Sequence, residues 1–507
     1  MCGTSTIHGE AFPVKSLTIF QQMSTTSKVE VDVLSFSALF LDSLYPLAVD
    51  TYQRGFVWNN DKVGQLCDDL ATFQSEANPK PPYYMGTILI HRNKDKQKHF
   101  IIDGQQRLTA LCVLHQQLNG SLPQNCSLTY SPKSALRILG AATIFREHAN
   151  RPSNDIFEQI VFTVIWVDRV DLAFTFFDTQ NNRGVPLHAT DLLKAYHLRA
   201  VDGAPTDHKE ALQTLCAKRW EGIQQGAPVM SHDQDFAPSL FTKFLWRARY
   251  WTGQRVIYGD HDALMEEFQK LTWKSKGDHA TIPLYPSRHN RLGTALTMTR
   301  DGHSEIHTNR ISLSPKAEDL PFSIRQPIQK GIGFFLYADK YSALLRRLLD
   351  KPKDSHEISR FQEVYEKLMM ANSVFLREIF LLASLLYADQ FDDEKIWEFS
   401  LWLEHALGAI RLEKQQVRYE AAQNFFKKDA MNLLDVIASS YRPDQVISHL
   451  NKYHSHATEY SHETIEPGKG VQGFYKQAVL SYYERTTATS LHDKHKWIGA
   501  KLKGCVV

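Results

Sequence analysis

One short segment of the chain changes from the pattern of a strand to the pattern of a helix at a single glycine. Residues 101–111 have the sequence IIDGQQRLTAL, and the apolar pair before Asp103 is typical of the end of a buried strand. Gly104 permits a backbone angle that other residues rarely adopt, and apolar residues recur at helical spacing beyond it. The segment therefore predicts a strand, a tight turn and a helix in immediate succession.

The sequence around this turn predicts a small mixed domain. Asn59 or Asn60 is a suitable N-cap for a helix that runs to about Phe73. The charged residues 92–98 predict the turn of a hairpin. The strands that we expect lie at residues 45–51, 84–91, 99–103 and 160–167, with further helices at about 106–118, 171–179 and from 188 or 190 onward.

The remainder of the chain has a helical periodicity from about residue 205 onward. The clearest helices are expected at residues 239–250, 262–271, 333–349, 359–388, 393–419 and 429–438. Residues 273–321 are rich in Gly, Pro, Ser, Thr and His, which indicates a long loop or an insertion with short strands. We therefore expect an α+β fold, with a leader at residues 1–27, a first domain at 28–200 and a helical domain at 201–507.

Composition bears on the partners and the cellular compartment of the protein, but it does not identify its function. The 58 basic and 56 acidic residues give a formal net charge of +2, so no global attraction to nucleic acid is evident, although a local basic patch stays open. The six cysteines form no C-x-x-C pair, which favours a reducing compartment and excludes a zinc ribbon. The first 26 residues lack the apolar core of a signal peptide, and no apolar stretch is long enough to span a bilayer. These features predict a soluble, cytoplasmic protein.

The turn at Gly104 is the most informative candidate site. A helix that starts there presents unpaired backbone amides and the positive end of its dipole, which suits a phosphate group. Arg107 has the geometry for a bidentate clamp on a phosphate, and Asp103 has the chemistry to hold a metal ion or position a water. The alternative is an ordinary strand-to-helix turn with a surface arginine.

Two other polar segments are weaker candidates. Residues 52–54 (YQR) with Trp58 offer rings to stack on a base, an amide to read its edge and a guanidinium for a phosphate. An aromatic cluster that closes the core is the alternative for these residues. The loop Asn181–Asn182–Arg183–Gly184 has the composition to bring amides and an arginine into a site, or it is a simple turn.

These segments occur in a fixed order: YQRGFVW, a helix, YYMGTILI, IIDGQQRLTAL and FFDTQNNRGVPLHATDLLKA. The series resembles a bacterial domain family with the signature Asp-Gly-Gln-Gln-Arg and a ParB/sulfiredoxin-like fold. Members of that family occur in GmrSD-type modification-dependent restriction enzymes and in SspE-type anti-phage proteins. The resemblance covers roughly residues 30–200, and five motifs in register rarely arise by chance.

The resemblance implies a ParB-like domain that binds or hydrolyses a nucleoside triphosphate with Mg²⁺, in which GTP, ATP and CTP are not distinguished. The residues that it implies as catalytic are Asp103, Gln105, Gln106 and Arg107, with Asp103 also the metal ligand. The residues that it implies for cofactor binding are Gln53, Arg54, Gly104, Thr109, Asn182, Arg183 and Gly184. It also implies a role in defence against foreign DNA, modified DNA included, together with a nuclease.

The sequence departs from the full-length enzymes in its C-terminal part. The histidines there lack the motif context of a His-Asn-His nuclease, and they are His454, His456, His462, His492 and His495. By residue type, His454 and His456 with His462 are candidate metal ligands, but a polar, His-rich loop is the favoured interpretation. We therefore expect any nuclease to lie in a partner protein.

Two further patterns receive a structural interpretation. Residues 468–473 fit G-x-G-x-x-G but follow no buried strand, so we assign them to a loop. Arg247, Arg249 and Arg255, near Trp246 and Trp251, predict a solvated helix face in preference to a DNA-facing groove.

Three hypotheses follow for function. The first is an NTP-dependent sensor and regulator of a restriction or anti-phage system, which works on DNA with a nuclease partner. The second is a self-contained, metal-dependent endonuclease at Asp103. The third is a non-enzymatic DNA-binding scaffold. The sequence leaves the oligomeric state open, a homo-oligomer included.

Overall fold

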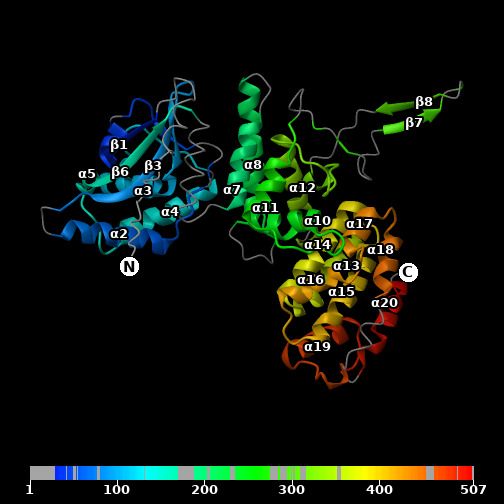
Figure 1. Ribbon diagram of the computed structural model, residues 1–507. Coiled ribbons are helices and arrows are strands. Elements are labelled where there is room, and N and C mark those ends of the chain that lie inside the picture. The colour runs from blue at the N-terminus through cyan, green and yellow to red at the C-terminus, as the bar shows by residue number, and fades with distance from the viewer. Residues whose placement is uncertain are drawn as a thin grey trace, which may run out of the picture. The chain divides into compact units, whose positions relative to one another are not determined.

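The chain folds into two compact units, Met1–Pro186 and Leu187–Val507, which are described separately below (Figure 1). The computed structural model describes residues 29–41, 43–49, 53, 55–76, 80–130, 132–169, 188–201, 206–228, 235–274, 282, 284–285, 294–298, 300, 303–308, 316–350, 355–452, 462–487 and 489–504.

The first unit is built on a mixed six-stranded sheet with the order β1-β6-β3-β4-β2-β5. β3 pairs antiparallel with β4 and parallel with β6, and β1 pairs antiparallel with β6 at the edge. The two shortest strands, β2 and β5, extend the sheet in parallel beyond β4. The strands are β1 (Val29–Ser35), β2 (Leu47–Ala48), β3 (Tyr83–Asn93), β4 (Lys98–Asp103), β5 (Cys126–Ser127) and β6 (Ile160–Val167).

Alternate residues of the central strands point to opposite faces of this sheet, as the strand period of two requires. Ile88, Ile101 and Val164 belong to the main core, together with buried residues of the helices, whereas Leu89 and Ile165 belong to a smaller cluster. The helices of this unit are α1 (Phe36–Leu41), α2 (Asn60–Ser75), α3 (Gln105–Asn119), α4 (Pro132–Glu147) and α5 (Ile156–Gln159). The strand and helix on either side of Gly104 thus meet in one hydrophobic core.

The second unit is mainly helical, and the α+β class that the sequence predicts is therefore confirmed for the chain. Its long helices are α7 (Ala189–Ala200), α8 (Thr206–Gln225), α12 (Ile332–Leu349), α13 (His356–Lys367), α14 (Val374–Phe391), α15 (Ile396–Glu413), α19 (Gly470–Tyr482) and α20 (Lys494–Lys503). Its shorter helices are α9 (Ala237–Ser239), α10 (Trp246–Tyr250), α11 (His261–Met265), α16 (Tyr419–Lys427), α17 (Leu433–Ser439) and α18 (Pro443–Asn451). Strand β7 (Thr294–Met298) pairs antiparallel with β8 (Ser304–Thr308).

Three of the helices expected in this unit are shorter than the periodicity suggested, because polar side chains bond to the backbone at new ends. The single helix expected at residues 359–388 is two helices in the structure, α13 and α14. Ser373 caps the start of α14, where its hydroxyl accepts a hydrogen bond from Leu376 N (3.3 Å). Residues 393–419 divide after Glu413, where Arg411 donates to the carbonyl of Gln415 (3.0 Å). α17 starts at Leu433 because Asn432 accepts from Asp435 N (3.1 Å).

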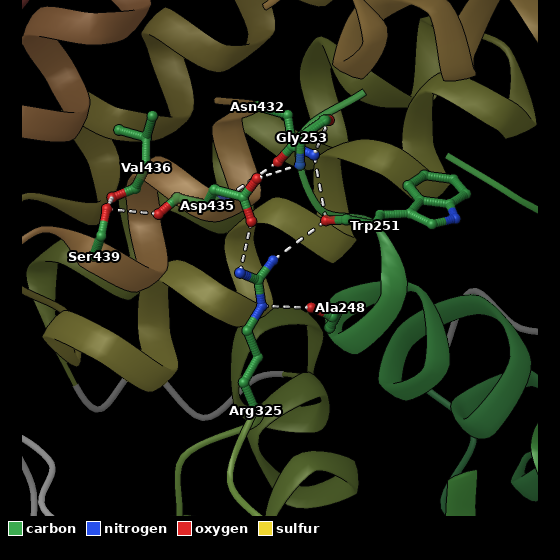
Figure 2. Close-up of polar contacts among 8 residues, drawn as sticks. All are labelled: Ala248, Trp251, Gly253, Arg325, Asn432, Asp435, Val436 and Ser439. Atoms are coloured by element: carbon green, nitrogen blue, oxygen red, sulfur yellow. Dashed lines mark hydrogen bonds and ion pairs between the residues drawn. The ribbon is translucent and has the colours of Figure 1, made fainter. Parts of the chain in front are cut away.

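A partly buried polar network joins distant parts of this unit (Figure 2). Arg325 donates to Asp435 Oδ1 (2.7 Å) and to the carbonyl of Ala248 (2.8 Å), while Gly253 N donates to Asp435 Oδ2 (2.6 Å). Asn432 adds bonds to the carbonyls of Trp251 and Gly253. These contacts fasten the end of α10 to the start of α17.

Among the residues that the structure describes, none of the helices is long and apolar enough to cross a membrane.

Candidate functional site

The turn at Gly104 has the conformation that its glycine predicted. Gly104 lies in the left-handed region with φ of 90°, and a side chain there would press on Ile88. α3 begins at Gln105, and its first hydrogen bond runs from Leu108 N to Gly104 O (3.0 Å). The amides of Gln105, Gln106 and Arg107 are therefore the ones that a helix start leaves outside the helical ladder.

The side chain of Gln105 points away from this turn and into the unit. Gln105 is buried, and its amide nitrogen donates to the hydroxyl of Tyr130 (3.4 Å). Thr109, one turn along α3, contacts the same hydroxyl and donates to the carbonyl of Gln105 (2.7 Å). Burial raises the pKa of Tyr130 to about 12, so this hydroxyl keeps its proton at neutral pH.

Gln106 holds the loop that precedes α2. Its Nε2 donates to the carbonyl of Gly55 (3.0 Å), and its Oε1 accepts from Val57 N (2.8 Å). Both ends of the amide are thus bonded to one backbone segment. The structure assigns Gln106 a part in fixing the 55–57 loop beside the start of α3.

Arg107 holds an irregular part of β3. Its Nη1 donates to the carbonyl of Met85 (2.8 Å), and its Nη2 donates to the carbonyl of Thr87 (2.7 Å). Gly86 lies between these carbonyls with φ of 101°, and a side chain there would meet the guanidinium. The pairing of β3 with β6 shifts register between Tyr84 and Thr87, so Arg107 stabilises a bulge.

The carboxylate of Asp103 forms an ion pair with this guanidinium. Its Oδ2 lies 3.7 Å from Arg107 Nη2, and the side chains of Asp103 and Arg107 are 40% and 26% exposed. The pair is therefore accessible to solvent at the edge of the turn. A carboxylate, a guanidinium and three helix-start amides together form a polar cluster.

Gln53 is the other binding residue that the structure places in this region. Its Nε2 donates to the carbonyl of Ile102 (3.0 Å) and contacts the carbonyl of Ile101, at the end of β4. The remaining expected binding residues, Arg54, Asn182, Arg183 and Gly184, lie outside the described residues. Among the expected site residues that are described, seven lie within or directly against the β4–α3 turn: Gln53, Asp103, Gly104, Gln105, Gln106, Arg107 and Thr109.

Tyr84 is a candidate site residue that the sequence analysis did not single out. It is exposed, and its hydroxyl lies 3.1 Å from Thr163 Oγ1 and 3.3 Å from Thr87 Oγ1. These hydrogen bonds, with a smaller effect of the charge of Arg107, lower the pKa of Tyr84. The signal in the sequence was Gly86, since a glycine inside a strand pattern marks a bulge that redirects its neighbours.

The favoured metal-binding expectation concerns Asp103. Within the described part of the chain, no group of three or more His, Cys, Asp and Glu side chains is arranged to hold a metal ion. His454 and His456 lie outside the described residues. One carboxylate beside a phosphate site is nevertheless a usual donor set for Mg²⁺, because the remaining ligands are phosphate oxygens and water.

The tryptophan and arginine cluster of the second unit is a buried structural cluster, and the prediction of a solvated helix face is wrong for two of its arginines. Arg247 donates to Glu378 (3.0 Å) and lies over the ring of Trp251, while Arg249 pairs with Glu267. Trp246 and Trp251 are also buried. A carboxylate from a distant helix neutralises each arginine, which lets it enter the core.

The prediction of a loop at the glycine-rich segment 468–473 is wrong for its last four residues, which the structure places in a helix. Gly468 and Gly470 have positive φ, and α19 begins at Gly470. Gly468 lies in the turn before the helix, and a side chain at Gly473 in the first helical turn would meet the carbonyl of Glu466, so the two segments pack closely.

Comparison with known families gives two matches. Residues 37–198 match the family described as GmrSD restriction endonuclease, N-terminal domain, and this confirms the resemblance to GmrSD-type restriction enzymes. Residues 212–466, about half of the chain, match a family of unknown function, DUF7834. No curated protein matches the sequence.

Proposed function

Because the chain belongs to the DUF7834 family of unknown function and has a GmrSD-type N-terminal domain, we propose that it binds and hydrolyses a nucleoside triphosphate as a sensor-regulator of DNA restriction. GTP, ATP and CTP are equal candidates for the nucleotide. The first unit supplies the nucleotide site in this proposal.

The observation that carries the proposal is that the side chains of the motif bond to other parts of the unit and not to the amides at the start of α3. Gln105 bonds to Tyr130, Gln106 to the 55–57 loop and Arg107 to β3. Gly104 has no side chain that could cap the helix. No side-chain cap occupies the amides of the first turn, which lie at the positive end of the helix dipole, and uncapped helix-start amides are the groups that bind phosphate.

Each polar group then has a distinct role toward the triphosphate. The amides of Gln105, Gln106 and Arg107 bind phosphate oxygens, and Arg107 adds positive charge while it holds β3. Asp103, at 3.7 Å from that guanidinium, orients the attacking water. Mg²⁺, held by Asp103 and the phosphates, would neutralise charge on the triphosphate. Gln53 and Gln106 keep the surrounding loops in place.

The restriction role comes from the family match of the first unit. A protein of this class acts on DNA, modified DNA included, and we propose that a separate nuclease chain performs the cleavage. The helical second unit is the part available for contact with DNA or with that partner. Salt-dependent binding of DNA is the expected property of such a surface.

Hydrogen exchange in the presence of nucleotide tests the site directly. The full chain is mixed with Mg²⁺ and GTP, ATP or CTP in separate samples, and exchange is followed by peptide. We expect at least one nucleotide to slow the amides of residues 105–107, because hydrogen bonds to phosphate protect them. Binding that protects other segments and leaves this turn unchanged would contradict the proposed site.

A further inference from the structure

Two thiols of the first unit lie in contact between α3 and β5. Cys112 is on α3 and Cys126 is on β5, and their Sγ atoms are 3.9 Å apart. Both are free thiols in this structure. A disulfide requires an S–S distance of about 2.05 Å, so an approach of roughly 2 Å would join them.

The two thiols differ in burial and in pKa, so we expect them to react in different steps. Cys112 is fully buried, and burial raises its pKa well above the ordinary range of a thiol. Cys126 is half-buried, and the hydrogen bond with Cys112 lowers its pKa. Cys126 is therefore the thiol that reaches solvent and ionises first, and Cys112 keeps its proton.

We propose that Cys112 and Cys126 are a redox-sensitive pair that peroxide converts into a reversible disulfide. The Cys126 thiolate attacks one oxygen of hydrogen peroxide, which breaks the O–O bond and gives a sulfenic acid and, after protonation, water. The Cys112 sulfur then attacks the sulfenic sulfur and gives its thiol proton to the departing hydroxyl, so the S–S bond forms, the S–O bond breaks and a second water leaves. The two thiols lose two electrons and two protons, and the peroxide is reduced to two waters.

The pair is connected to the motif through Tyr130, four residues after Cys126. The Tyr130 hydroxyl bonds to both Gln105 and Thr109, at the start of α3. Drawing β5 toward α3 shifts the segment that carries Tyr130 and strains these bonds. We expect the disulfide to change the rate of nucleotide turnover, and this expectation rests on the proposed function. Formation of the disulfide itself does not rest on it.

Peptide mapping of the full chain tests the pair. The reduced protein is treated with graded hydrogen peroxide, alkylated, digested without reductant and analysed by mass spectrometry. Cys67 and Cys216 are internal controls, because both are buried and burial raises their pKa values to about 11 and about 12. We expect a linked Cys112–Cys126 peptide that dithiothreitol removes, at a dose that leaves these two thiols reduced.

Two variants make the test specific. Cys126→Ser leaves Cys112 reduced at the same dose, and Cys112→Ser leaves Cys126 as a sulfenic or sulfinic acid. A linkage of either cysteine to a different one, or oxidation of Cys126 in the wild type with Cys112 still reduced, would overturn the proposal. Phosphate release by the reduced wild type is measured in parallel, so an absence of turnover would contradict only the proposed function.

Discussion

Arg107 illustrates how one side chain serves both the fold and a candidate site. Its guanidinium donates to two carbonyls of β3 and lies beside Asp103 at the surface. The sequence predicted an arginine at a helix start. The sequence did not predict the two hydrogen bonds to β3, because they depend on the bulge between Tyr84 and Thr87, about 20 residues earlier in the chain. In the proposed phosphate site, Arg107 therefore contributes both its positive charge and its fixed position beside the start of α3.

The forked geometry of Arg107 gives a testable effect on stability. Arg107→Lys keeps the charge but cannot bond both carbonyls in the same way. Loss of one charged hydrogen bond to a half-buried carbonyl predicts a fall in unfolding free energy of about 1–3 kcal/mol. Urea unfolding of the variant measures it, with Arg146→Lys as the control because Arg146 is exposed. Equal stability of the two variants would contradict the role given to the fork.

His197 gives a prediction for the dependence of stability on pH. Its ring is fully buried between Phe268 O, 2.7 Å from Nε2, and Gly331 N, 3.1 Å from Nδ1. Burial lowers its pKa to about 3, so the folded protein holds the neutral ring. The unfolded chain, with an ordinary pKa of about 6.5, binds a proton between these two values.

The sign of the effect follows from that difference in bound protons. The contribution of the neutral His197 ring to the free energy of unfolding is complete above pH 6.5. It is lost as the pH falls toward 3, with a slope of at most about 1.4 kcal/mol per pH unit. His197→Gln removes this titration, so its stability should vary less with pH over the same window. An unchanged pH slope in chemical unfolding of the variant would refute the assignment.

At the scale of elements, α3 is the one whose ends the sequence specifies best. Glycines flank it on both sides, and both adopt positive φ. α4 was not predicted, because it exposes Leu136 and Leu139 and therefore lacks a clean amphipathic pattern. Within the strand expected at residues 45–51, the described residues 45–49 form a strand at Leu47–Ala48, where they pair with β4 and β5.

The two glycines that flank α3 provide a matched pair of substitutions. Gly104 and Gly120 have φ of 90° and 74°, so alanine is strained at both. A side chain at Gly104 also meets Ile88, whereas at Gly120 it meets nothing within 4 Å. We expect Gly120→Ala to lower stability by about 1 kcal/mol and Gly104→Ala by clearly more. Thermal unfolding of both variants measures the difference, and an equal loss would show that the contact with Ile88 is unimportant.

At the scale of the whole molecule, the chain combines a nucleotide-site candidate with a larger helical unit. Periodicity and the order of five motifs sufficed to predict the α+β class and the family of the first unit. The ends of helices in the second unit were harder to predict, because capping by Ser373 and Asn432 depends on single side chains. The burial of Arg247 and Arg249 depends on partners distant in sequence, Glu378 and Glu267, which no local pattern reveals.

The most direct measurement of the central claim is phosphate release by the full chain with Mg²⁺ and each nucleotide, with and without DNA. Asp103→Asn preserves the shape of the side chain and should lower the rate at least about 100-fold, because a positioned carboxylate contributes at this scale. Asp95→Asn, in the exposed turn of the same hairpin, is the matched control and should retain the wild-type rate. Turnover that is lost only in Asp103→Asn is the predicted result, and equal turnover in both variants, or none in the wild type, would contradict the account.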